Sequence, residues 1–215
     1  MIDPALKLLS LFATLLVCLP NPSSAAASPE AEFHMARMVY GSDEGNRGWR
    51  PWWAIDYPWL FVQQVGHWSL NDAEIAALRE YVARGGFLVV DDFHGSYDWA
   101  RFSQTMARVF PGWPIVGISL EHPVMHVVYD LDQSTQIPGR RHLYRARNGE
   151  IGARLQGPAG WHGIYDQNGR LVVAINHNMD MGDAWEHADD PVYPIPMTSL
   201  AYRFAVNYVV YAMTH

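Results

Sequence analysis

The stretch "SLNDAEIAALREYVARGGFLVVDDFHG", Ser69–Gly95, contains a helix pattern followed directly by a strand pattern. Ile75, Leu78 and Val82 recur at helical spacing, and Gly85 stands where a helix commonly ends. A capping box can begin the helix in either of two pairings, Ser69 with Asp72 or Asn71 with Glu74. The first part of the stretch therefore predicts an amphipathic helix that packs one face on a core.

The run "FLVV", residues 87–90, follows the helix without a loop of any length. A continuous apolar run of this length is typical of a strand that is covered on both faces, as in a parallel sheet. The stretch thus predicts a helix that leads straight into a central strand, which is the repeating unit of an α/β fold.

The rest of the chain supplies further strands and helices in alternation. Strands are predicted at Phe33–Ser42, Trp59–Gly66 and 114–120, a second helix runs from Ser96 to Pro111, and a closing helix covers 199–215. Asn168-Gly169 lies between two apolar runs, which indicates a β-hairpin. We therefore predict an α/β fold with a mostly parallel sheet and a late β-hairpin that adds an antiparallel edge.

Residues 1–27 have the pattern of a secretory signal peptide. Lys7 precedes an apolar run, Leu8–Leu19, which is too short to span a bilayer, and small residues follow. Val17 before Cys18 argues against a lipoprotein signal. We expect cleavage after Ala27, a single domain over 28–215 and no membrane span after cleavage. The protein would be exported, and periplasmic in a Gram-negative host.

Composition excludes several classes of function for the expected mature chain. Cys18 and Lys7 are the only cysteine and the only lysine, and both would leave with the signal peptide. Thiol nucleophiles, disulfides and lysine Schiff bases are then impossible. The net charge of −7 at pH 7 argues against a nucleic-acid partner.

Asp91, Asp92 and His94 directly follow the predicted central strand. Open α/β sheets bind ligands at the carboxyl ends of their strands, so these three are the candidate catalytic residues. Side chains alternate along a strand, and we expect only one of the two aspartates to line the site. Three interpretations remain open: a carboxylate that orients a histidine, a pair of metal ligands, or Asp92 capping the next loop with His94 at the surface.

Two further segments carry candidate ligand-binding residues. In "EHPVMHVVYDL" the two histidines stand four residues apart, a spacing that on a helix suits zinc, whereas Pro123 favours a structured turn. "NHNMDMGDAWE" follows a predicted strand but fails the calcium-loop pattern, because Met181 and His187 replace its glycine and glutamate. We expect no cofactor, with a metal as the alternative. The candidates are His122, His126, Asn176, His177, Asp180, Asp183 and Glu186.

Several phrases together resemble a bacterial domain of unknown function, DUF4159. Among them are "RMVYGSD", "GHWSLNDAEIAALREYVARGGFLVVDDFHG", "GRLVVAINHNMDMGDAWE" and "NYVVYAMTH", and the similarity runs from Phe33 to His215. The resemblance implies a class I glutamine amidotransferase-like fold near the ThuA-like proteins, which is a flavodoxin-like three-layer sandwich. It implies no particular activity.

The sequence departs from this pattern in two ways. Amidotransferases use a cysteine nucleophile, and the expected mature chain has none, so that mechanism is excluded. Members of the family also carry a helix and a strand between a "DYP" phrase and the strand before "GHWSL", whereas here "AIDYPWLFVQQVGHWSL" is continuous. We therefore expect a sheet that lacks one βα unit.

The leading functional expectation is non-catalytic binding of a small polar molecule or a cell-envelope component. The alternative is a hydrolase, in one version metal-assisted, that acts on a sugar or a related envelope substrate. In that case Asp91 or Asp92 would be the general base, His94 a proton shuttle, and Asp180 or Asp183 a second carboxylate or metal ligand. The sequence leaves open whether the protein is an enzyme and what its oligomeric state is.

Overall fold

The computed structural model describes residues 35–37, 58–131 and 135–215. All of these residues belong to one compact unit. The predicted signal peptide and most of the first predicted strand lie outside the described residues. So does 38–57, whereas the shortening expected after Tyr57 falls at the start of the described range 58–131, and the loss of a βα unit there stays a prediction. Within the described part, no helix is long and apolar enough to cross a membrane.

The central sheet is mixed and mostly parallel, as predicted. Its strands lie in the order β1-β2-β3-β8-β7-β4. Parallel pairing joins β1 to β2, β2 to β3 and β3 to β8, whereas β7 is antiparallel to both β8 and β4. The strand bounds are β1 Met35–Arg37, β2 Trp59–Gln63, β3 Phe87–Asp91, β4 Val116–Gly117, β7 Gly160–Tyr165 and β8 Leu171–His177.

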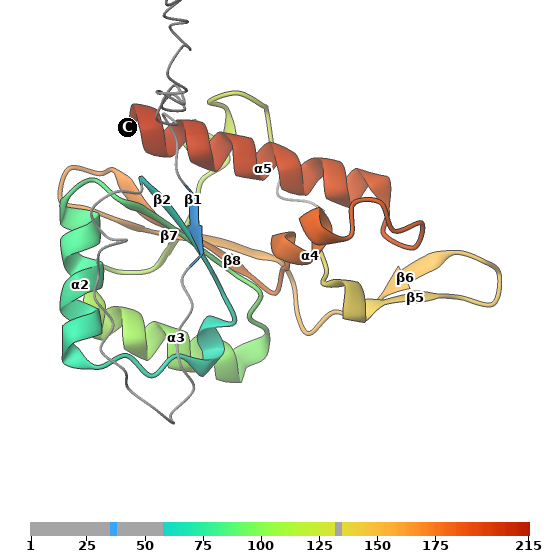
Figure 1. Ribbon diagram of the computed structural model, residues 1–215, viewed down its shortest axis with the longest axis horizontal. Coiled ribbons are helices and arrows are strands. Elements are labelled where there is room, and N and C mark those ends of the chain that lie inside the picture. Colours follow the sequence, from blue (N-terminus) through green and yellow to red (C-terminus); the bar gives the residue numbers. More distant parts are fainter. Residues whose placement is uncertain (1–34, 38–57, 132–134) are drawn as a thin grey trace, which may run out of the picture. The chain divides into compact units, whose positions relative to one another are not determined.

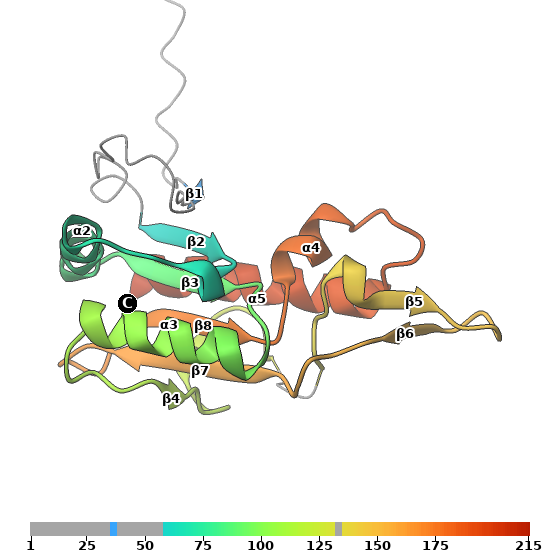
Figure 2. The ribbon, with the colours of Figure 1, turned by 90° about the horizontal axis from the view of Figure 1, so that it is seen from below.

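Helices cover both faces of this sheet and make a three-layer sandwich. In Figure 1, α2 (Asp72–Ala83) and α3 (Gly95–Val109) lie below the sheet, and α5 (Ile195–Thr214) crosses above it. Figure 2 shows the sheet face-on, with α3 in front of the strands and α5 behind them. The short helix α4 (Met181–Glu186) connects β8 to the segment before α5. The predicted α/β fold class and the late hairpin, β7–β8, are confirmed.

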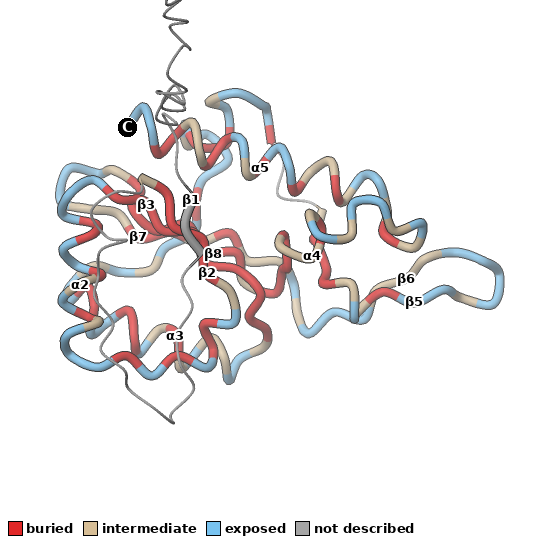
Figure 3. The backbone as a smooth tube through the Cα atoms, in the orientation of Figure 1, coloured by how far each residue is buried: buried red, intermediate tan, exposed pale blue. Residues whose placement is uncertain are grey.

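The strand β3 is buried along its whole length, as its uninterrupted apolar sequence predicted. Phe87 and Val89 pack into the core beneath α5, while Leu88 and Val90 pack into the core beneath α2 and α3. The two cores appear in Figure 3 as buried segments on either side of the central strands. Alternation along one strand therefore divides its side chains between both hydrophobic layers.

The helix α2 begins and ends as its sequence indicates. Of the two capping boxes, the structure forms the one at Asn71, whose side chain accepts hydrogen bonds from the backbone N–H groups of Ala73 and Glu74. The Glu74 carboxylate in turn accepts from the Asn71 N–H at 2.8 Å. Gly85 has a φ of +98°, a conformation that ends the helix and that glycine adopts without strain.

The connection between β4 and β7 contains elements that the sequence did not predict. Two 3₁₀ turns, η2 (Pro123–Met125) and η3 (Arg140–His142), precede a separate antiparallel hairpin of β5 (Leu143–Arg145) and β6 (Ile151–Ala153). A further 3₁₀ turn, η1 (Val65–His67), links β2 to α2. Figure 1 shows β5–β6 extending away from the central sheet, while η3 lies close to α4.

Candidate functional site

Three parallel strands end at the same edge of the sheet in an uncommon backbone conformation. Gln64, Asp92 and Asn178 are the first residues after β2, β3 and β8, and their φ angles are +56°, +48° and +60°. They are the non-glycine residues with positive φ in the described part of the chain. Such backbone costs about 1 kcal/mol or more per residue, less for Asn and Asp, and is concentrated at functional sites.

Asp91 points inward from the end of β3 and is completely buried. Its Oδ2 accepts hydrogen bonds from the backbone N–H groups of Met181, at 2.7 Å, and Gly182, at 3.1 Å. Its Oδ1 has no hydrogen-bond partner among the described residues. Burial is the main cause that raises the pKa of Asp91 to about 7, and the neighbouring charge of Asp92 adds to it. Asp91 thus holds the start of α4 against β3.

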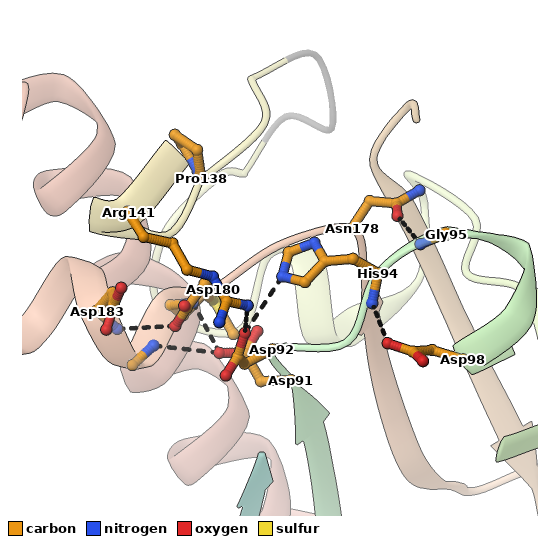
Figure 4. A network of polar contacts seen from close by, with 12 residues as sticks. Asp91, Asp92, His94, Gly95, Asp98, Pro138, Arg141, Asn178, Asp180 and Asp183 are labelled. Carbon is orange, nitrogen blue, oxygen red and sulfur yellow. Dashed lines mark hydrogen bonds and ion pairs between the residues drawn. The ribbon is translucent and has the colours of Figure 1, made fainter. Parts of the chain in front are cut away.

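Asp92 points the other way, toward His94 and Arg141 (Figure 4). Its Oδ1 lies 3.2 Å from Nε2 of His94 and accepts a hydrogen bond from the Arg141 guanidinium, also at 3.2 Å. Burial favours the neutral acid, but hydrogen bonds from His94 and Gln64 and the charge of Arg141 together lower the pKa of Asp92. Asp92 is therefore an ionised carboxylate at neutral pH. As alternation predicted, the two aspartates face different surroundings.

Asp180 and Asp183 lie beside this pair at the start of α4. Asp180 caps the helix, because its Oδ1 accepts from the backbone N–H of Asp183 at 2.9 Å. Its Oδ2 lies against Gly139, where a Cβ atom would come within 2.6 Å. Burial, followed by the charges of Asp91 and Asp92, raises the pKa of Asp180 to about 9. Asp180 thus keeps its proton at neutral pH.

The segment Pro138–His142 closes over the strand ends. The Arg140 backbone N–H donates to Oδ2 of Asp183 at 2.7 Å, and the Arg140 side chain pairs with Asp190. The ring of His142 stands edge-on to that of His94, with centroids 5.0 Å apart. Burial and the charge of His94 lower the pKa of His142. This segment brings Arg141 and His142 to the site from about 50 residues away in the sequence.

The end of β8 is joined to the start of α3. Asn178 Oδ1 accepts from the Gly95 N–H at 2.8 Å, and its amide group donates to the Pro158 carbonyl. His177 reaches the Gly95 carbonyl through Nε2 at 3.1 Å, and its ring contacts those of Phe93 and Trp99. Burial lowers the pKa of His177. These contacts place His94 at the edge of the sheet.

The other candidate residues lie elsewhere. His122 caps the amino end of η2, where its Nδ1 accepts from the Val124 N–H, and its ring contacts Tyr165 and Tyr211 at the other end of the parallel strands. His126 is exposed and pairs with Asp130. The two histidines flank this single 3₁₀ turn and are not on one face of an α-helix, so the structured-turn interpretation is right for this pair.

Asn176 and Glu186 also lie away from Asp92 and His94. Asn176 is buried beneath α5, where its Oδ1 accepts from the Tyr208 hydroxyl at 2.8 Å. Glu186 is exposed at the last position of α4. His94 is only 7% exposed, so the interpretation of His94 as a surface residue is wrong.

The site combines Asp92, His94, Arg141 and His142 with a second layer of Asp91 and Asp180. Arg141 and His142 were not predicted as site residues. The only signal for them in the sequence was an Arg-Arg-His run in an acidic chain. Within the described residues, no group of three His, Cys, Asp or Glu side chains is arranged to hold a metal ion. The arrangement offers an ionised acceptor beside several donors, which suits a small polar molecule.

Comparison with known families agrees with the resemblance seen in the sequence. The family model described as a domain of unknown function, DUF4159, matches residues 54–213. No curated protein matches the chain. Because the match covers more than half of its length, the chain belongs to the DUF4159 family.

Proposed function

We propose that this DUF4159 protein binds a small polar molecule, free or as part of a cell-envelope component, without catalysing its conversion. The observation that carries the proposal is the left-handed backbone of Gln64, Asp92 and Asn178 at three neighbouring strand ends. Glycine would adopt this conformation without strain. All three positions carry a residue with a side chain instead of glycine, which indicates that these side chains have a function at the site.

The groups that would contact the ligand are less buried than Asp91 and Asp180. Asp92 and His94 are 6% and 7% exposed, and the Arg141 side chain is 59% exposed. An ionised acceptor next to guanidinium and imidazole donors suits a ligand that both donates and accepts hydrogen bonds. Sugars, polyols and amino acids have this chemistry.

Binding is favoured over catalysis because of what the carboxyl groups already do. Asp91 is inaccessible, and one of its oxygens holds two backbone N–H groups of α4. Asp92 has a lowered pKa and an arginine partner, which makes it a weak general base. Neither aspartate is prepared to take a proton from a substrate at neutral pH.

A thermal-shift screen tests the proposal. The wild-type protein is heated with sugars, polyols and amino acids, and then compared with Asp92→Asn and Arg141→Gln. We expect at least one compound to raise the melting temperature of the wild type and to do so much less in both variants. Arg84→Gln is the matched control, because Arg84 is exposed and pairs with Glu80 on α2. Equal shifts in wild type and Asp92→Asn would rule out this site.

The hydrolase remains a second candidate because of one contact. His94 Nε2 lies 3.2 Å from Asp92, an arrangement in which a carboxylate orients an imidazole for proton transfer. Turnover of a glycoside panel by the wild type, lost in His94→Ala and measured with and without a chelator, would establish catalysis and its metal dependence. We expect no turnover.

Export is also part of the proposal, and it rests on the signal-peptide pattern of residues 1–27. Fractionation of a Gram-negative host that expresses the full chain should place a shortened product in the periplasm. Full-length protein in the cytoplasm would contradict export.

A further inference from the structure

The hairpin β5–β6 and its two flanks carry a charge opposite to that of the whole chain. Residues 139–157 contain five arginines and a single acidic residue, Glu150, whereas the complete sequence has 15 basic and 22 acidic residues. The arginines are Arg140, Arg141, Arg145, Arg147 and Arg154. A positive segment is thus concentrated on one projecting element of an acidic protein.

The five arginines fall into two groups. Arg140 and Arg141, at the base of the hairpin, pair with Asp190 and Asp92. Arg145, Arg147 and Arg154 are exposed, and none of them forms an ion pair with a carboxylate in the parts of the chain that the structure describes. The outer three arginines are therefore available to an anionic partner.

The two faces of the hairpin differ. Leu143 is buried in the core beneath α5, and Ile151 and Ala153 pack against the same core. On the other face Tyr144 is 42% exposed, with the Arg154 guanidinium 5.2 Å from its ring centroid. Leu155, just after β6, is 45% exposed. Tyr144 and Arg154 thus share the outward face, while Arg145 and Arg147 are exposed at the end of β5 and in the turn that follows it.

The position of the hairpin makes this face accessible. Figures 1 and 2 show β5 and β6 extending beyond the central sheet and the helices that cover it. No third strand pairs with them among the described residues. A flat partner can therefore reach the outward face without touching α2 or α3.

We propose that this hairpin docks on the surface of an anionic phospholipid bilayer. Arginines bind lipid phosphates, and tyrosine is favoured at the level of the headgroups. The acidic remainder of the chain would be repelled by the same surface, so that only the hairpin faces it. Such docking does not depend on the ligand site, because the three outer arginines make no contact with Asp92 or His94.

Vesicle co-sedimentation tests the docking. The full chain is mixed with vesicles of phosphatidylcholine containing phosphatidylglycerol, and with vesicles of phosphatidylcholine alone, which report attachment through apolar segments. We expect binding to the anionic vesicles that weakens as salt is added. Replacing Arg145, Arg147 and Arg154 together by Gln should weaken this binding about a hundredfold.

The matched control removes the same charge elsewhere. Arg84, Arg108 and Arg203 are exposed on the helices, and their joint replacement by Gln should leave vesicle binding unchanged. Circular dichroism and the melting temperature verify that both triple variants are folded. Equal sedimentation with the two kinds of vesicle, or equal binding by the two triple variants, would overturn the proposal. Hairpin-dependent binding found only with polyglutamate or a DNA duplex would also overturn it, because the partner would then be a macromolecule.

Discussion

The chain turns in different ways at the amino ends and at the carboxyl ends of the parallel strands, which are called here the amino edge and the carboxyl edge of the sheet. At the amino ends of β3 and β8, positive φ angles occur at Gly85 and Gly169, where a Cβ atom would meet nothing within 4 Å. At the carboxyl ends of the same strands, positive φ angles occur at Asp92 and Asn178. The amino edge uses glycine, which adopts this conformation without strain. The carboxyl edge uses residues whose side chains form the candidate site or hold it in place.

The carboxyl groups at the two ends of the strands follow the same division. Near the amino ends, Asp166 accepts hydrogen bonds from the N–H groups of Asn168 and Arg170 and so closes the turn between β7 and β8. At the carboxyl ends, Asp91 and Asp180 are buried together with raised pKa values. The carboxyl group at the amino edge thus stabilises a turn, whereas the burial of two carboxyl groups at the carboxyl edge lowers the stability of the protein. The predictions below start from this contrast.

The largest effect is expected from Asp91→Ala. This change leaves two backbone N–H groups at the start of α4 without an acceptor in a buried place, and should lower the free energy of unfolding by about 3 kcal/mol. Asp166→Ala at the amino edge removes hydrogen bonds nearer to solvent and should cost about 1 kcal/mol. Urea unfolding measures both. Asp91→Asn retains an acceptor oxygen and should restore most of the loss; similar losses in both Ala variants would contradict the contrast.

A smaller effect is expected for pH. The unfolded chain releases these protons near pH 3.8, whereas folded Asp91 and Asp180 hold them until about 7 and about 9. The folded state therefore binds more protons in this window, and stability should fall as the pH rises from 4 to 9. Asp180→Asn keeps the helix cap and should reduce that loss. Parallel stability curves for this variant and the wild type, measured by urea unfolding at each pH, would contradict the prediction.

Placing glycine at the carboxyl edge, or alanine in place of a glycine at the amino edge, should change the free energy of unfolding by about 1 kcal/mol in opposite directions. Gln64→Gly relieves a left-handed conformation and should raise stability, while weakening binding of any compound found in the thermal-shift screen. Gly85→Ala imposes that strain at the amino edge and should lower stability by about 1 kcal/mol with binding unchanged. Chemical denaturation and ligand titration measure the two effects. A loss of stability in Gln64→Gly would mean that its side chain contributes more than its backbone costs.

The smallest effect is expected on stability at acidic pH. Burial lowers the pKa of His177, so that below about pH 6.5 the unfolded chain binds a proton that the folded chain resists. Stability should therefore decrease as the pH falls through this range. His177→Phe keeps a ring in contact with Phe93 and Trp99 and should make the decrease shallower. An unchanged acid slope in thermal unfolding would assign that slope to other groups.

Local patterns were enough to predict the layers of the fold. The helix α2, with its cap and its terminal glycine, and the buried strand β3 follow from residues that are neighbours in the sequence. The position of Asp91, Asp92 and His94 at a strand end followed from the same stretch, as did the opposite orientation of the two aspartates. Apolar periodicity and turn residues act over a few residues, so one stretch contains the information.

Only the tertiary structure decided which polar residues meet. Arg141 and His142 reach Asp92 and His94 through a long connection whose path has no periodic pattern, and His122 and His126 diverge although their spacing suggested a pair. The sequence by itself determined a mostly parallel sheet between helices, with two aspartates and a histidine at its carboxyl edge. Packing determined the raised pKa values of Asp91 and Asp180 and the partners of Asp92, because burial and charge proximity depend on segments that are distant along the chain.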